Sequence, residues 1–239
     1  GLAPAVALML PRCFRRKALP ASANVALITT LALLLSGTLM IAAFEWNGIL
    51  SGLTVFDKIQ NAWFQSVTLR TAGFNSVDLS PITGPTFLIM VFFMFIGGSP
   101  GGTAGGVKTT ALGILSLTFW SHIRRREDVI VSHRRGPAAV VYQAVTIIMS
   151  GLIILFLSVM MLELTQQISV RELIFEAASA VGTAGLSIGA TGKLDEIGKL
   201  IIIMSMFAGR IGPMTLFILL DNDAPHTVKK YPDAKISLT

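Results

Sequence analysis

Charged side chains are scarce in this chain of 239 residues, since only 13% are Asp, Glu, Lys or Arg. Ordinary soluble domains carry about 25%. Cysteine is almost missing, and the single Cys13 excludes a disulfide within the chain. The few histidines, His122, His133 and His226, lie in or beside basic segments and lack metal-ligand spacing. These absences argue against a disulfide-stapled secreted domain and against a Cys/His metal centre.

Apolar residues are abundant instead, at 53% of the chain, and the mean hydropathy is +0.72. The net charge is +6. Twelve of the 19 basic residues fall in three clusters: Arg12, Arg15, Arg16 and Lys17; Arg124, Arg125, Arg126, Arg134 and Arg135; and Lys229, Lys230 and Lys235. Each cluster flanks an apolar segment, which follows the positive-inside rule of membrane proteins. A phosphate-binding face for nucleic acid is therefore the less favoured interpretation.

Four apolar segments are long enough to cross a bilayer, which needs about 20 residues. They cover residues 24–44, 81–120, 138–162 and 197–220. A glycine-rich stretch divides the second, so we expect one broken span there, because Gly and Pro disfavour helix. If the basic clusters are cytoplasmic, residues 45–80 and 163–196 lie on the outer side.

Those outer segments each carry the signature of a helix start. Thr54 precedes Asp57, and Ser169 precedes Glu172, as in a hydroxyl N-cap with an acid three residues on. About a dozen mostly apolar residues follow, too few to cross, and then a turn rich in Gly and Thr. This pattern predicts two re-entrant helices that dip into the membrane and return as extended chain.

An internal repeat connects these elements. TAGF at residues 71–74 matches TAGL at 183–186, and MFIG at 94–97 matches MFAG at 206–209, both at an offset of 112 residues (183 − 71 and 206 − 94). Each unit reads span, re-entrant helix, turn, span. Two spans return the chain to its starting side, so we predict parallel units rotated about the membrane normal, unlike inverted repeats.

Parallel units bring equivalent turns to one axis, where backbone carbonyls can bind a cation. The C-terminal ends of the short helices would point there, and the helix dipole favours a cation at that end. Gly73 and Gly185 suit such turns because glycine allows carbonyl orientations that other residues do not. The alternative is an ordinary helix C-cap or close helix packing. Two equivalent copies after equivalent helices favour the filter.

Several runs resemble the Trk/Ktr/HKT superfamily of potassium transporters, and most of all the C-terminal half of its Ktr-type membrane subunit. QSVTLRTAGFN at residues 65–75 is similar to the third pore loop, and IGGSPGGTAGGVKTT at 96–110 to the gating loop. AGRIGP at 208–213 and YPDAKI at 231–236 are similar to the last inner helix and the C-terminus. The resemblance implies an all-α integral membrane fold of parallel membrane–pore-loop–membrane repeats around a central pore, with four repeats in the family and two here.

The resemblance also implies a division of the chain. Residues 1–23 are the end of a preceding inner helix and a cytoplasmic loop, because residues 1–10 can be laid on 210–219. The third repeat covers 24–122, with its gating loop at 97–110. A basic cytoplasmic loop covers 123–137, the fourth repeat 138–220, and a cytoplasmic tail 221–239. We therefore expect the C-terminal half of a larger subunit; a half-size channel that pairs to form a pore is the alternative.

Carried onto this sequence, the family's selectivity filter binds K+ at backbone carbonyls. It falls on Leu69, Arg70, Thr71, Ala72, Gly73 and Phe74, and on Val181, Gly182, Thr183, Ala184, Gly185 and Leu186. In the family, glycine at the key position of all four loops goes with potassium, and serine in the first loop with sodium preference. Glycine stands at both positions here. Na+ is the alternative transported or activating ion, and no covalently bound cofactor is expected.

The gate implied by the resemblance is the glycine-rich stretch below the filter. It comprises Gly97, Gly98, Ser99, Pro100, Gly101, Gly102, Thr103, Ala104, Gly105, Gly106, Lys108 and Thr109, together with Arg210. Irregular backbone at membrane depth must be buried in protein or line a cavity. Two alternatives compete. One is a phosphate-binding loop, which would need a preceding strand and no Val107 before the lysine. The other is a helix-packing GxxxG motif.

Arg210 lies about a dozen residues into its span, roughly 18 Å at 1.5 Å per residue. A charge there costs about 2.5–3.5 kcal/mol and usually faces a cavity or a partner. We expect it to bond the carbonyls or hydroxyls of the loop and to add a positive barrier. A structural arginine that ties two helices together is the compatible, plainer interpretation.

The predicted function is transmembrane uptake of potassium by a multi-pass protein of the cell membrane. An enzyme is not expected, because no nucleophile–base pair occurs in the membrane and Glu45 and Glu163 fit the interface. A non-conducting scaffold or assembly protein is the alternative. The resemblance implies a homodimer bound to a cytoplasmic nucleotide-sensing RCK ring. Lipid is a further partner, anionic lipid is the competing explanation for the basic loop, and nucleic acid is not expected.

Overall fold

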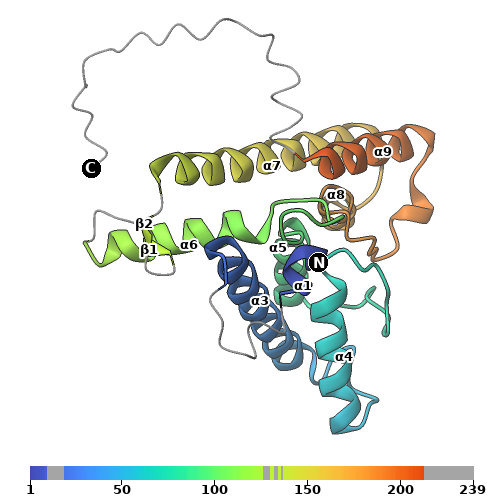
Figure 1. The fold of residues 1–239 in the computed structure, drawn as a ribbon. Coiled ribbons are helices and arrows are strands. Elements are labelled where there is room, and N and C mark those ends of the chain that lie inside the picture. Colours follow the sequence, from blue (N-terminus) through green and yellow to red (C-terminus); the bar gives the residue numbers. More distant parts are fainter. Residues whose placement is uncertain (10–18, 126–129, 132–133, 136, 213–239) are drawn as a thin grey trace, which may run out of the picture.

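The computed structural model describes residues 1–9, 19–125, 130–131, 134–135 and 137–212 (Figure 1). In chain order, its elements are α1 (Pro4–Ala7), α3 (Ala21–Glu45), α4 (Val55–Thr68), α5 (Gly84–Phe95), α6 (Thr109–Ile123), β1 (Ile130–Val131), β2 (Arg134–Arg135), α7 (Ala138–Thr165), α8 (Val170–Gly182), η1 (Thr191–Lys193) and α9 (Glu196–Ile211). The strands form one antiparallel pair in the basic loop. Apart from this pair, the predicted all-α architecture is confirmed in the described ranges.

Two helices are long and apolar enough to cross a membrane by length and composition. Helix α3 has 25 residues and α7 has 28, with mean hydropathies of 2.2 and 2.6 over their most apolar 18 residues. They contain the predicted spans 24–44 and 138–162. Only 33% and 28% of these stretches are buried, so most of their apolar side chains face outward. A helix that is apolar all round is typical of a membrane span.

The second predicted span is broken, as expected. Helix α5 has 12 residues and α6 has 15, or about 18 and 22 Å, and neither alone covers a hydrocarbon core of about 30 Å. Residues 96–108 between them are not helical. Helix α9 begins one residue before the predicted fourth span, whose last part, residues 213–220, lies outside the described residues.

Both predicted helix starts are confirmed. The hydroxyl of Thr54 accepts a hydrogen bond from the backbone N–H of Asp57 at 3.3 Å, and the hydroxyl of Ser169 accepts one from Glu172, also at 3.3 Å. Each cap satisfies an N–H that has no partner within its helix. The two short helices, α4 and α8, are thus begun by the same local chemistry.

Helix α8 is the most buried element and packs on α5, α7 and α9. Figure 1 shows it between the α7–α9 pair and α5. Phe175 of α8 stacks on Phe87 of α5, with 6.1 Å between ring centroids. Helix α4, its counterpart in the repeat, packs mainly on α3 and leaves Phe56, Ile59 and Trp63 exposed. The same kind of helix is therefore covered in one unit and open in the other.

Glu45, the last residue of α3, is buried in the protein. Its carboxylate accepts hydrogen bonds from the backbone N–H of Thr83 at 2.9 Å, from the Thr83 hydroxyl at 2.8 Å and from the N–H of Ile49 at 3.2 Å. Thr83 is the N-cap residue of α5. The acid thus joins the end of α3 to the start of α5, whereas Glu163 is exposed as expected.

Candidate ion pathway

The two predicted filter turns have positive φ angles at equivalent positions. Thr71 and Thr183 have φ angles of 66° and 52°, and Gly73 and Gly185 have φ angles of 77° and 83°. Positive φ at a β-branched residue is rare. Its occurrence at both threonines shows that the matched sequences fold alike.

The two turns also lie against each other. A Cβ atom added to Gly73 would stand 2.9 Å from the carbonyl oxygen of Ala184, and one added to Gly185 would stand 3.3 Å from the Cα atom of Gly73. A side chain at Gly73 would therefore push the neighbouring turn away. Glycine is needed there for its positive φ and for this close approach.

The other predicted filter residues differ in exposure. Leu69, Val181, Gly182, Ala184 and Leu186 are buried, whereas Ala72 and Phe74 are exposed. The buried Arg70 side chain reaches helix α3, where it donates to the carbonyl of Thr30 at 3.5 Å. The equivalent positions thus differ, because Ala184 and Leu186 are covered in the second turn whereas Ala72 and Phe74 are exposed in the first.

Side-chain hydrogen bonds that were not predicted from the sequence join each short helix to the segment that follows its turn, and we call them braces. Gln65 donates to the hydroxyl of Ser76 at 3.3 Å. Ser187 donates to the carboxylate of Glu176, which also accepts from the hydroxyl of Thr191 at 2.9 Å. Both braces join residues 11 positions apart. The two pairs are offset by 111 residues (176 − 65 and 187 − 76), one fewer than the repeat offset of 112, so matching the repeat alone does not identify them.

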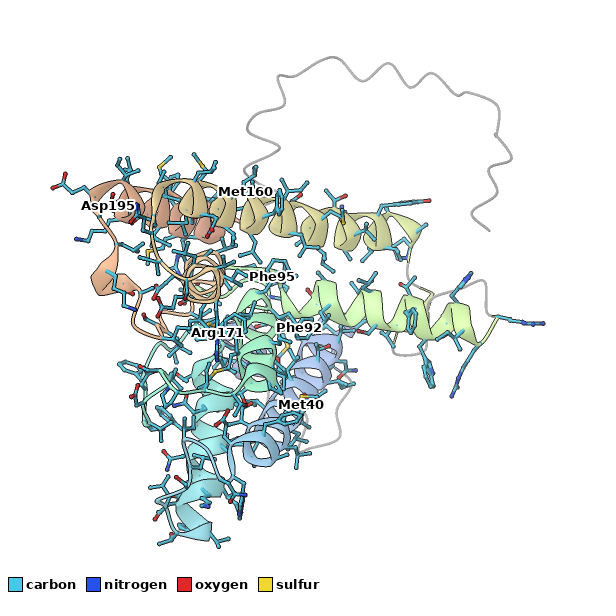
Figure 2. All side chains as sticks on the ribbon, turned by 180° about the vertical axis from the view of Figure 1, so that it is seen from behind. Met40, Phe92, Phe95, Met160, Arg171 and Asp195 are labelled. Carbon is cyan, nitrogen blue, oxygen red and sulfur yellow. The ribbon has the colours of Figure 1, made fainter. Side chains whose placement is uncertain are left out.

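The glycine-rich loop has a paired stem. The N–H of Gly97 donates to the carbonyl of Val107 at 2.9 Å, the N–H of Val107 donates to Phe95 at 3.1 Å, and Ile96 pairs with Val107 as a parallel bridge. Phe95 packs with Val107, Ala111 and Ala144 where α5 meets α6 and α7 (Figure 2). The loop is therefore not a continuous helix, and it follows a helix rather than a strand. Both alternative motif interpretations are excluded.

The loop is buried at its stem and exposed at its tip. Residues 97–99 and 104–107 are buried, whereas Pro100, Gly101 and Thr103 are exposed. On one side, the N–H of Ser99 donates to the carbonyl of Gly1 at 2.7 Å. On the other, the N–H groups of Gly105 and Gly106 donate to the Thr183 hydroxyl at 2.9 Å and to the Gly209 carbonyl at 3.2 Å. These bonds satisfy backbone groups that lipid could not.

Two cationic side chains hold neighbouring carbonyls of the loop. Arg210, in the last turn of α9, donates to the carbonyl of Thr103, and Lys108 donates to that of Ala104. The predicted contact between Arg210 and the loop is thus present. Whether Arg210 governs a gate stays a prediction. A cation passing the loop would meet both positive charges.

Within the described ranges, no group of three or more His, Cys, Asp and Glu side chains is placed to hold a metal ion. What the turns offer a cation is carbonyl and hydroxyl oxygen. Such oxygens suit hard monovalent ions that exchange quickly, as in selectivity filters.

Comparison with known proteins identifies close relatives. Residues 12–227 match the family model TrkH, described as a cation transport protein. The chain is 37% identical over 212 residues, 88% of its length, to the Ktr system potassium uptake protein B of Vibrio alginolyticus. It is 35% identical over 231 residues, 94% of its length, to the potassium/sodium uptake protein NtpJ of Enterococcus hirae. It covers 46% and 51% of these two proteins, about half their length.

The fold has a solved counterpart. The crystal structure of the potassium transporter TrkH from Vibrio parahaemolyticus matches 84% of this chain with a TM-score of 0.69 and 22% sequence identity, and the match covers 44% of that protein. The similarity supports the arrangement of the helices.

Proposed function

Because this chain belongs to the TrkH family of cation transport proteins, we propose that it forms part of a membrane pathway for potassium uptake. Its relatives in Vibrio alginolyticus and Bacillus subtilis, 37% and 34% identical, are potassium uptake proteins. The relative in Enterococcus hirae is a potassium/sodium uptake protein, which keeps Na+ as the second candidate ion. Transport, not catalysis, is the role that this family indicates.

One observation carries the proposal: two turns of identical sequence, Thr-Ala-Gly, have positive φ angles at equivalent positions and touch each other. Each follows a short capped helix, α4 or α8, whose C-terminal end points into the turn. Helix dipoles place partial negative charge at those ends, which stabilises a cation. Carbonyl oxygens of the turns would then replace part of the hydration shell of K+.

In this proposal the helices form two parallel repeats about one pore axis, with α3, α4 and α5–α6 equivalent to α7, α8 and α9. The open face of α4, which carries Phe56, Ile59 and Trp63, would be covered by a further repeat of the native protein. The glycine-rich loop obstructs the inner side of the filter and moves aside to admit the ion. Its bonds to Thr183, Gly209 and Arg210 are those that opening would break.

The surroundings proposed for the chain are the lipid of the cell membrane and a cytoplasmic partner. Side chains such as Met40 on α3 and Phe92 on α5 point outward, 41% and 53% exposed, and fit an acyl-chain environment (Figure 2). The basic loop 123–137 would face the cytoplasm together with the tail 221–239, which lies outside the described residues. A homodimer and an RCK-type ring are the proposed protein partners.

The selectivity of transport for K+ over Na+ tests the assignment of the two turns as a filter. Gly73→Ser and Gly185→Ser, made in the native membrane protein, place a side chain against the neighbouring turn, so both should lower the preference for K+ over Na+ in a flux assay. Gly192→Ser is the matched control, because a Cβ atom there meets nothing within 4 Å and no positive φ is required. Unchanged selectivity in both filter variants, as folded protein, would overturn the filter assignment.

A non-conducting scaffold is the alternative function, and the same experiment separates it. A scaffold predicts no K+ flux from the reconstituted native protein. The open face of α4 would suit a scaffold surface as well as a further repeat. The paired filter turns have no place in a scaffold, and therefore the transport proposal is favoured.

A further inference from the structure

Thr183 belongs to a filter turn, yet its side chain is bonded to the glycine-rich loop. Its hydroxyl oxygen accepts a hydrogen bond from the N–H of Gly105, with 2.9 Å between donor and acceptor. The residues are 78 positions apart in the chain. The proposed filter and the proposed gate are therefore joined by one direct bond.

The loop backbone also fills the space in front of that hydroxyl. A Cβ atom on Gly105 would stand 2.5 Å from Cγ2 of Thr183, 2.7 Å from its Oγ1 and 2.9 Å from the carbonyl oxygen of Gly209. Only glycine can sit so close to the threonine. While the loop stays in this place, no ion can reach the Thr183 oxygen from the side that the loop occupies.

The equivalent residue in the other turn is arranged differently. Thr71 also has a positive φ, 66° against 52° at Thr183. Among the hydrogen bonds of the described residues, none involves the Thr71 hydroxyl. Of these two threonines, only Thr183 is tied to the loop.

We propose that the Thr183 hydroxyl is a latch shared between the loop and the transported cation. In the conformation described, its oxygen is held by Gly105; when the loop moves aside, the oxygen is released and becomes a K+ ligand at the inner end of the filter. A hydroxyl suits both tasks because its lone pairs accept an N–H or coordinate a cation. The part of this proposal in which Thr183 binds K+ rests on the proposed transport function.

This arrangement couples ion occupancy to loop position. K+ would bind better to the open state, in which the oxygen is free, than to the state described here. A ligand shifts an equilibrium by the ratio of its affinities for the two states. K+ should therefore favour opening, and removal of the hydroxyl should both loosen the loop and abolish that dependence.

Loop position can be measured without measuring transport. Ala104 is 6% exposed beside the loop stem. In the native protein, with Cys13 replaced by Ser, Ala104→Cys gives a reporter thiol whose rate of modification by a charged methanethiosulfonate reagent measures loop opening. Thr183→Val should raise this rate about fivefold, which is about 1 kcal/mol at tenfold per 1.4 kcal/mol. Thr183→Ser, which keeps the hydroxyl, should stay near the parent rate.

Thr71→Val, measured without added K+ so that ion occupancy of the filter does not contribute, is the matched control, since it removes the equivalent hydroxyl and breaks no loop bond. It should leave the modification rate near that of the parent. Gly105→Ala provides a second route, because its methyl group would overlap Thr183 and the carbonyl of Gly209 while the sequence of the filter turn stays unchanged, and it should also raise the rate. Equal rates for Thr183→Val and Thr71→Val, with no rise in Gly105→Ala, would overturn the latch.

Binding of K+ by Thr183 is tested by the effect of K+ on the modification rate. Added K+ should speed modification of the parent reporter and leave Thr183→Val unaffected, whereas no response of the parent to K+ would overturn Thr183 as an ion ligand. Suppose that Thr183→Val raises the modification rate of the reporter thiol but the protein carries no K+ flux in any assay. That result would support the bond between Thr183 and the loop as a structural latch, and it would overturn the proposed transport function. The two failures are thus distinguishable.

Discussion

Arg171, in the first turn of α8, lies over the ring of Phe87 in α5, with 5.1 Å between its guanidinium carbon and the ring centroid. The same guanidinium donates to the carbonyl of Ile82, just before α5 (Figure 2). Phe87 in turn stacks on Phe175. One side chain thus joins the start of α8 to α5 and to the residue just before it.

Arg171→Ala should therefore destabilise the folded protein by about 1–3 kcal/mol. This is less than the roughly 2–4 kcal/mol expected from a cation–π contact plus a charged hydrogen bond, because Arg171 is exposed to solvent. Thermal unfolding in detergent would show this as a lower midpoint. Arg124→Ala is the control, because Arg124 also lies over an aromatic ring, Trp120 at 4.7 Å, but that ring belongs to the helix that Arg124 itself caps, α6. Equal shifts for both variants would show that Arg171 does not join α8 to α5.

Deletion of residues 99–105 should raise K+ flux through the native protein and weaken its control by a cytoplasmic partner. The deletion removes the exposed tip together with the bonds from Ser99 and Gly105. Potassium uptake, normalised to folded protein in the membrane, is the measurement. Lower flux from a well-folded deletion would mean that the loop is part of the conducting wall.

Arg210→Ala should act in the same direction, because it removes the donor to Thr103 and one positive charge from the path. A hydrogen bond to a charged group contributes about 1.5–3 kcal/mol, so the closed-to-open ratio should fall roughly tenfold or more. Arg210→Lys should restore the charge and only part of the anchoring, since Lys lacks the planar fork of donors. Potassium uptake equal to the parent in Arg210→Ala would leave Arg210 a purely structural role.

Charge reversal at Arg124, Arg125 and Arg126 tests the cytoplasmic face. Co-purification with an RCK-type ring should weaken, because opposite charges steer and fix such contacts. Reversal at Lys193, on the predicted outer side, should have no effect and serves as the control. Undiminished co-purification with altered dependence on anionic lipid would assign the basic loop to the membrane surface instead.

Asp195 gives a pH-dependent prediction outside the membrane spans. Hydrogen bonds from the N–H of Gly198 and from Gln166 lower the pKa of its carboxyl group. A lowered folded-state pKa stabilises the fold above the unfolded value of about 3.9, and this contribution is lost as the pH falls through the folded pKa. The stability difference between the parent and Asp195→Ala should therefore shrink on acidification below about pH 4. A difference that stays constant would mean that Asp195 is not ionised as a cap.

Local features were predictable from the sequence because they depend on neighbouring residues. The caps at Thr54 and Ser169, the break after Phe95 and the two turns all rest on short-range chemistry of hydroxyls, Gly and Pro. The burial of Glu45 was not predictable, because its partner, Thr83, lies 38 positions away. The brace at Gln65 and the bond from Gly105 to Thr183 likewise depend on how helices meet. Hydropathy carries no information about such pairings.

The paired stem of the glycine-rich loop has a consequence for how fast the loop can open and close. In the proposed gate, residues 98–106 move while the bond between Gly97 and Val107 is kept, so that no helix has to unwind or tilt. Motions of short loops take nanoseconds to microseconds, whereas collective movements of domains take microseconds to milliseconds. A loop of this kind could open and close many times during one domain movement of a carrier. The rate of transport would then be limited by the passage of ions through the filter and not by the movement of the loop.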